Sequence, residues 1–450
     1  MLNSIWLGLI LLAVVLGGAA GALDKVTAAA FKACQIAVID LALPLIGMMA
    51  LWLGIMRLAE KSGLIEILAR ALRPLMRRLF PDVPPEHPAM GSMLMNMAAN
   101  MLGLGNSATA LGLRAMKDLE SLNPRPGTAT NAMVTFLAIN TSSIQIIPAT
   151  TIAYLAAAGA TQPTAIVGPA FFATVISTIV AVVMVKFFER LPGYRLPITI
   201  PEAAPTARLE SPAAAPAATP ETNFPARPLA PWAIALIGLF FLFFAWLGYE
   251  QIRKAAETGP GVTFTVVANA ISLLAVPFVL SFFPFFAALK RVPVYEEFVE
   301  GAKEGFHVAI RVIPYLVAIL VAIWMVRAAF DASAQFGWFR QVTGGLNTAL
   351  AAIGFPPQLL PLVLMRPLSG SGSNGIFADL LKDPSAGGPD GFIARTAGCI
   401  IGSSETTFYV LAVYFGSVAI RRTRHAVPAG LLADLAGVIA SIVICRLVFA

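Results

Sequence analysis

Long apolar segments recur along the sequence, and they constrain the fold more than any other feature. A run of about 20 apolar residues is long enough to cross a hydrocarbon core of about 30 Å. The composition agrees, because 58% of the 450 residues are hydrophobic, only 12% are charged and the mean hydropathy is +0.79. The runs lack the alternation that transmembrane β-strands require. The sequence therefore predicts an all-α polytopic membrane protein.

Several of these segments are long enough to be full spans. The first ends in small residues like a secretory signal peptide, and we interpret it as an uncleaved helix. The predicted spans are Leu2–Ala22, Ala37–Met56, Thr128–Ala157, Thr164–Phe187, Pro231–Gly248, Val262–Leu289, Val308–Arg327, Phe392–Phe415 and Ala426–Phe449.

A Pro/Ala-rich stretch interrupts the apolar pattern between Pro192 and Pro231. Such a composition cannot bury a core, and it favours a flexible linker with polyproline character. The chain is thereby divided into a first membrane repeat, residues 1–191, a linker, residues 192–230, and a second membrane repeat, residues 231–450.

The two membrane repeats share features in the same order, which indicates an internal duplication. Each has a span that starts near a proline and ends at an arginine, then an amphipathic stretch, a polar stretch, a Lys-Asp pair, a span with a double serine and a last apolar helix. The polar stretches are "GLGNSATALG" from Gly103 to Gly112 and "LSGSGSNGIF" from Leu368 to Phe377.

The distribution of positive charge predicts how the repeats are oriented. Lys and Arg concentrate on cytoplasmic loops, which places the linker and the clusters at 57–78 and 421–424 in the cytoplasm. An odd number of crossings then separates the matching spans, so the two repeats are inverted relative to each other. Inverted repeats are common in secondary transporters.

Each polar stretch is expected to form the tip of a re-entrant helical hairpin, the first from the cytoplasm and the second from outside. Irregular backbone at membrane depth persists only when it is buried in protein or lines a wet cavity. Pro148 further predicts a kink in the first double-serine span. Where tips meet broken or polar-interrupted helices, a polar solute can bind; the alternative is that Gly, Ser and Asn only allow close helix packing. The predicted substrate-binding residues are Asn106, Ser107, Thr109, Asn140, Ser142, Ser143, Gln145, Ser371, Ser373, Asn374, Ser403, Ser404, Glu405 and Thr406.

Glu405 carries the only formal charge in that set. Carboxylates inside a membrane are costly and usually functional. Glu405 could bind a coupling cation, take up a coupling proton or pair with an amine of the substrate. The alternative is a buried ion pair with Arg366 or Arg395.

No motif in the sequence indicates an enzyme, a cofactor, a metal site or nucleic-acid binding. Neither glycine-rich stretch continues into the Gly-Lys-Ser/Thr of a phosphate-binding loop. The cysteines stand isolated in apolar surroundings and the histidines have no partner at ligand spacing. These residues are Cys34, Cys399, Cys445, His87, His307 and His425.

Two long motif sets give the sequence a family resemblance. "NMAANMLGLGNSATALGLRAMKDL" and "FLAINTSSIQIIPATTIAYL" in the first half resemble spore maturation protein A, whereas "LMRPLSGSGSNGIFADLLKD" and "GCIIGSSETTFYVLAVYFGS" in the second half resemble spore maturation protein B. The resemblance implies a fusion of two usually separate chains. It also implies a nucleoside-recognition, or gate, fold similar to concentrative nucleoside transporters, some of which are homo-oligomers.

Three classes of function follow from these patterns. The leading hypothesis is a secondary transporter or translocation pathway for a small polar solute in the bacterial cytoplasmic (inner) membrane, with the lipid bilayer as its surroundings. The second is a non-transporting membrane assembly factor in envelope or spore maturation. The third, a membrane-embedded enzyme acting on lipid-linked precursors, has only Ser404 beside Glu405 in its favour.

Overall fold

The computed structural model describes residues 2–103, 105–194, 230–258, 262–333, 337–383 and 386–449. Most of the linker, residues 195–229, therefore lies outside the described residues. In chain order the helices are α1 (Leu2–Ala19), α2 (Leu23–Gln35), η1 (Ile36–Ala42), α3 (Leu43–Lys61), α4 (Leu64–Leu79), α5 (Pro88–Met101), α6 (Gly105–Glu120), α7 (Asn131–Ser142), α8 (Ala149–Ala157), η2 (Pro163–Ile166), α9 (Val167–Arg190), α10 (Pro231–Thr258), α11 (Phe264–Leu289), α12 (Val294–Ser333), α13 (Gly337–Ala352), η3 (Pro357–Leu359), α14 (Leu360–Met365), α15 (Gly370–Lys382), α16 (Phe392–Gly402), α17 (Thr407–Gly416) and α18 (Ala426–Phe449).

The all-α membrane fold is confirmed. Among the described residues, six helices are long and apolar enough to cross a membrane. Two predicted boundaries were wrong, because the span placed at Ala37–Met56 belongs to one continuous helix, Leu23–Lys61. The span placed at Val308–Arg327 is likewise part of the 40-residue helix α12. Charged residues near these helix ends lower the hydropathy without breaking the helix, so the apolar run was shorter than the helix.

The two longest helices pack antiparallel along most of their length. Arg57 at the end of α3 donates to Glu297 near the start of α12, with an N–O distance of 2.7 Å. At the other end, the ammonium group of Lys32 lies 5.7 Å from the ring centroid of Trp324. Close approach between them depends on glycine, since a Cβ on Gly301 would stand 2.5 Å from the carbonyl oxygen of Leu53. Small residues at such contacts let helix backbones approach closely.

A π-helical segment, η1, lies inside the continuous helix just before Pro44. Proline has no amide hydrogen to donate to the preceding turn. The Leu43 N–H bonds to the carbonyl of Val38, five residues back. The extra residue accommodates the proline without ending the helix.

Two predicted spans are broken in the structure. Thr128–Ala157 divides into α7 and α8, and Phe392–Phe415 divides into α16 and α17. Pro148 precedes the first residue of α8, as expected for a residue that cannot continue the preceding helix. The second break contains no proline and consists of residues 403–406, three of which carry hydroxyl side chains that offer the backbone alternative hydrogen bonds.

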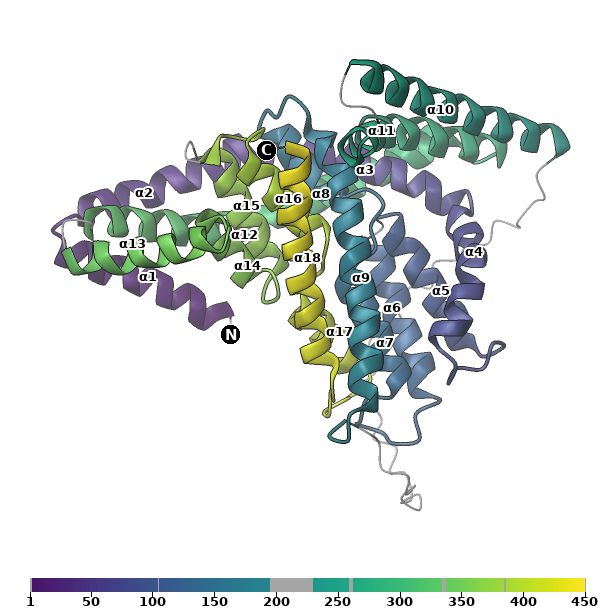
Figure 1. Ribbon diagram of the computed structural model, residues 1–450, viewed down its shortest axis with the longest axis horizontal. Coiled ribbons are helices and arrows are strands. Elements are labelled where there is room, and N and C mark those ends of the chain that lie inside the picture. The colour runs from purple at the N-terminus through teal and green to yellow at the C-terminus, as the bar shows by residue number, and fades with distance from the viewer. Residues whose placement is uncertain are drawn as a thin grey trace.

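The last helices of the two halves, α9 and α18, stand side by side at the centre of the molecule (Figure 1). They are antiparallel, because Ser177 in the middle of α9 donates to the carbonyl of Ala433, while Phe172 and Val448 pack on one small cluster. The α10 helix contacts α11 and leaves large apolar side chains exposed, among them Trp232, Leu239 and Leu242.

A pair of consecutive helices lies at each place where a hairpin was expected, with one correction. The first is α5–α6, which turns at Leu102–Gly103, and the second is the shorter pair α14–α15. The polar residues were expected at the turns themselves, but they lie in the first turns of α6 and α15. Ser369 caps α15 by accepting from the amide of Gly372 at 3.0 Å. Ser369 therefore stabilises the first turn of α15, which is the second helix of this hairpin, and does not interrupt that helix.

Candidate functional site

The two broken helices cross with their breaks in contact. The amide of Glu405 in the second break donates to the carbonyl of Thr141 at the end of α7, at 2.6 Å. A Cβ on Gly402 would stand 2.8 Å from the Cβ of Pro148. The interrupted backbone of each half therefore borders the interrupted backbone of the other.

Hydroxyl groups of α9 satisfy the end of α7. Thr174 donates to the carbonyls of both Ser142 and Ser143, at 2.9 and 2.6 Å. Thr178 donates to the hydroxyl of Ser142 at 2.9 Å. The Ser143 backbone has a φ of 40° and its buried hydroxyl has no hydrogen-bond partner among the described residues. A non-glycine residue in this region stores conformational strain, and such strain clusters at functional sites.

A buried arginine satisfies the end of α16. Arg366, which is only 4% exposed, follows α14 at the turn of the second hairpin. Its guanidinium donates to the carbonyl of Ile401 at 3.0 Å and to the carbonyl of Ser404. The last carbonyls of a helix have no partner within the helix, and a cation also interacts favourably with the negative end of the helix dipole. The hairpin turn is thus bonded to the break beside it.

Each hairpin turn touches the break of its own half. In the first half, the amide of Ile146 donates to the carbonyl of Met101 at 3.0 Å. In the second half, the amide of Phe408 donates to the carbonyl of Pro367, also at 3.0 Å. A displacement of either hairpin would therefore break hydrogen bonds to a broken helix.

An amide cluster that the sequence analysis did not include lies beside the first break. Asn100 of α5 donates to the side-chain oxygen of Asn140 at 2.8 Å, and Asn96 donates to the carbonyl of Ala108 at 2.7 Å. The Tyr414 hydroxyl of α17 lies 3.4 Å from the same Asn140 oxygen. Asn96 and Asn100 stand four residues apart inside an apolar hairpin arm, a signal that could have identified them from sequence.

Two carboxylates, Glu405 and Asp434, lie at or beside the second break, and only Glu405 was among the predicted site residues. Glu405 is half-buried, and within the described part of the chain it forms no ion pair with Arg366 or Arg395. Arg395 instead pairs with Asp390 at 3.2 Å. Asp434 of α18, which is 6% exposed, accepts a hydrogen bond from Thr407 at 2.5 Å. Asp434 was missed because it lies in a long apolar helix outside the repeated motifs.

The predicted site residues divide into three groups. Asn140, Ser142, Ser143, Ser403, Ser404 and Thr406 are buried around the two breaks, with Gln145 and Glu405 partly exposed beside them. Ser373 is buried and Asn374 half-buried in the first turns of α15, whereas Ser371 is exposed. Thr109 is half-buried in α6, and the side chains of Asn106 and Ser107 lie outside the described part of the chain.

A cavity of about 80 Å³ adjoins the first break and is lined in part by Asn100, Asn140 and Thr178. Sites for drug-sized ligands hold roughly 300–1,000 Å³, so this cavity is too small for such a ligand.

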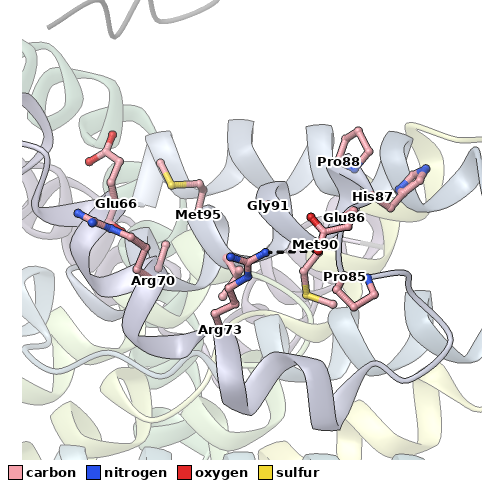
Figure 2. Close-up of a pocket in the computed structure, with 12 residues that line it drawn as sticks. Glu66, Arg70, Arg73, Pro85, Glu86, His87, Pro88, Met90, Gly91 and Met95 are labelled. Atoms are coloured by element: carbon pink, nitrogen blue, oxygen red, sulfur yellow. Dashed lines mark hydrogen bonds and ion pairs between the residues drawn. The ribbon is translucent and has the colours of Figure 1, made fainter. Parts of the chain in front are cut away.

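A larger and more open pocket, of about 440 Å³, lies between α4 and α5 (Figure 2). Its ion pair between Arg73 and Glu86 spans 4.0 Å and is exposed. Exposed pairs contribute little energy, and this pocket shares no lining residue with the breaks.

Comparisons with known proteins show which proteins the chain is similar to. The family model described as "Nucleoside recognition" (Gate) matches residues 42–161, which include α3, the first hairpin and the first break. Spore maturation protein A of Bacillus subtilis is 45% identical over 188 residues, which are 42% of this chain and 95% of that protein. Spore maturation protein B of the same organism is 43% identical over 183 residues, 41% of this chain and 97% of that protein. No solved structure matches the chain.

The fold and these matches define a multi-pass α-helical membrane protein with a nucleoside-recognition gate domain. Two relatives above 40% identity are covered almost completely by the chain. The chain therefore belongs to the family of spore maturation proteins A and B.

Proposed function

We propose that this chain is a translocation pathway for a small polar solute in the bacterial cytoplasmic membrane. One observation carries the proposal: two broken helices, each bonded to a hairpin turn, meet with their breaks in contact through Glu405 and Thr141. Broken helices free backbone groups that can bind polar solutes and ions. The buried hydroxyls of Ser142, Ser403 and Ser404 add further polar atoms.

The proposal includes a fusion in which the first half is A-like and the second half is B-like. The antiparallel pairing of α3 with α12 and of α9 with α18 supports an inverted relation between the halves. The cavity beside the first break is too small for such a solute, and it would have to widen before a solute could bind there. In this proposal the hairpins move, and their movement breaks the hydrogen bonds between the hairpin turns and the breaks.

Glu405 is the proposed contact for a positively charged group of the solute or for a coupling ion. It is half-buried and free of an ion pair within the described residues, so its charge is available to a ligand. The hydroxyl-rich breaks suit a solute with several hydrogen-bonding groups, and the match to a nucleoside-recognition domain makes nucleosides the first probes.

The test is uptake of a mixture of labelled nucleosides by proteoliposomes that contain the full chain. We expect saturable uptake that is lost in a Ser142→Val/Ser403→Val variant, because valine closes the breaks with apolar surface. Tyr409→Phe, at an exposed position of α17, is the matched control and should transport normally. A stable complex with other envelope proteins in the absence of any flux would support the assembly-factor hypothesis instead.

A further inference from the structure

Asp434 is a buried carboxylate in the middle of a predicted span, and none of the sequence motifs includes it. Its Oδ2 accepts from the Thr407 hydroxyl at 2.5 Å, while its Oδ1 is buried without a hydrogen-bond partner among the described residues. Thr407 is the first residue of α17, directly after the second break. The carboxylate therefore faces the candidate site with one oxygen atom available.

Among the described residues, few charged groups surround Asp434. Arg366 and Glu405 are the two that act on it most strongly, with opposite signs. The neighbouring α7 and α9 present hydroxyl groups at this depth, and α11 has no titratable side chain. Further away, Cys399 of α16 faces Cys445, Tyr414 of α17 faces Asn140, and Lys186 of α9 pairs with Glu189.

A metal ion does not suit this position. The described residues contain no group of three or more His, Cys, Asp or Glu side chains that could hold a metal ion. The nearby carbonyls of Ile401 and Ser404 already accept from Arg366, whose positive charge repels a second cation. A proton needs only one oxygen atom, and it removes the cost of burying an isolated carboxylate charge.

We propose that Asp434 binds and releases a proton, and that this proton is coupled to the translocation proposed above. In the conformation of Figure 1 Asp434 is neutral: an O–H bond forms at Oδ1 with a proton taken from water, and Thr407 keeps its hydrogen bond to Oδ2. When the site opens to the other side, that O–H bond breaks and the proton returns to water. No other group changes its covalent state.

The second hairpin provides the link between protonation and opening. Arg366 lies at the turn of this hairpin and donates to carbonyls of the second break, yet it forms no ion pair with Asp434 within the described residues. A hairpin movement that broke those bonds would free the guanidinium to approach Asp434. An opposite charge nearby favours the ionised carboxylate, so hairpin movement and proton release occur together. This role rests on the proposed function, whereas the proton site itself does not.

Infrared spectroscopy of the full chain in lipid nanodiscs tests the proton site without a solute. At neutral pH we expect a carbonyl band of a buried carboxylic acid that disappears in Asp434→Asn and remains in Glu405→Gln. Thr407→Val should shift this band by removing its hydrogen bond, and it provides a second variant if Asp434→Asn does not fold. A band that persists in Asp434→Asn, or is lost only in Glu405→Gln, would overturn the proposal.

The coupling role is tested by nucleoside uptake with and without a pH gradient. We expect uptake by the unmodified chain to respond to the gradient, and uptake by Asp434→Asn to lose that response. Gradient dependence retained in Asp434→Asn would overturn the coupling role. No uptake by any variant, together with an Asp434 band, would reject the proposed function and leave the proton site standing.

Discussion

Individual residues in the two breaks perform different tasks although the sequence presents them as similar hydroxyls. Ser142 is hydrogen-bonded on both sides, by donating to Ile139 and by accepting from Thr178. Ser143, its neighbour, has a positive φ and a buried hydroxyl that has no partner within the described part of the chain. The first residue stabilises the end of α7, and the second one stores strain.

Substitution of these two serines should therefore change stability in opposite directions. Ser143→Gly should stabilise the protein by roughly 1 kcal/mol, because glycine adopts positive φ without a steric cost. Ser142→Ala should destabilise it by about 1 kcal/mol through lost hydrogen bonds. Denaturant unfolding of the two variants in detergent measures the difference. Destabilisation by Ser143→Gly would show that the strained conformation is not the one adopted in solution.

His425 predicts a dependence of stability on pH. It precedes α18, packs on Phe188 and Tyr194, and has no hydrogen-bond partner on either ring nitrogen among the described residues. Burial, and then the charges of Arg424 and Lys186, lower the pKa of His425 from 6.5 to about 4. Between these two values the unfolded chain binds more protons, so stability rises with pH.

The contribution of His425 should be complete above its ordinary pKa of 6.5 and should be lost as pH falls toward about 4. Thermal unfolding across this window should show a falling Tm, and His425→Phe should reduce the slope. His307→Asn, at an exposed position of α12, is the control and should keep the slope. An unchanged slope in His425→Phe would assign the pH dependence to other groups.

The close contact between α3 and α12 requires small residues where the two helix backbones approach each other. On α12, a Cβ at Gly305 would stand 2.5 Å from the carbonyl oxygen of Met49, whereas a Cβ at Gly47 on α3 would meet no atom within 4 Å. Gly305→Ala should cost about 1–3 kcal/mol by overpacking the helix contact. Gly47→Ala should be stabilising by up to about 1 kcal/mol, since alanine favours helix. Equal effects of the two changes, in unfolding measurements, would contradict the packing of α3 against α12.

The contact between α16 and α18 can be tested through cysteine. Cys399 and Cys445 seemed isolated in the sequence, but the structure places their sulfur atoms 3.3 Å apart, with both thiols free and buried. A membrane-permeant oxidant should therefore link them, and mass spectrometry of the digest should identify the linked peptides. Cys34, on α2, is the internal control and should remain unlinked. Links to Cys34 in place of the expected pair would show that α16 and α18 are arranged differently.

At the scale of the whole molecule, corresponding parts of the two halves meet one another. The α3–α12 and α9–α18 pairs are antiparallel, and the α7–α8 break faces the α16–α17 break. Tyr154 of α8 packs edge-on against Phe377 of the second hairpin, as Tyr414 of α17 packs against Gly112 of the first. Such reciprocal contacts are expected for two inverted repeats related by a pseudo-two-fold axis.

If the repeats are inverted as predicted, the ends of the two hairpins are accessible from opposite sides of the membrane. Asp383 is buried against Arg327, so the adjacent Lys382 is the better probe, with Lys117 at the matching place in the first half. In a chain with Cys34→Ala, a membrane-impermeant reagent applied outside intact cells should label Lys382→Cys and spare Lys117→Cys. Labelling of both variants, or of Lys117→Cys alone, would contradict the inverted-repeat prediction.

The sequence by itself determined the features that depend on composition and local pattern. Apolar runs long enough to cross the hydrocarbon core, without the alternation of β-strands, predict helical spans. Pro148 interrupts a helix because it cannot donate a backbone hydrogen bond. The glycines and serines of the polar stretches predicted two hairpins. The motifs also indicated the family, which the relatives confirm.

Tertiary structure alone decided which polar groups have partners. Arg366 bonds carbonyls that lie 35 and 38 residues away, Asn100 reaches Asn140, and Asp434 meets Thr407. No local pattern encodes such pairs, because each depends on how helices distant in sequence are packed. Helix packing therefore determines which charged side chains lie near the breaks. Asp434 could be identified as one of them only from the tertiary structure.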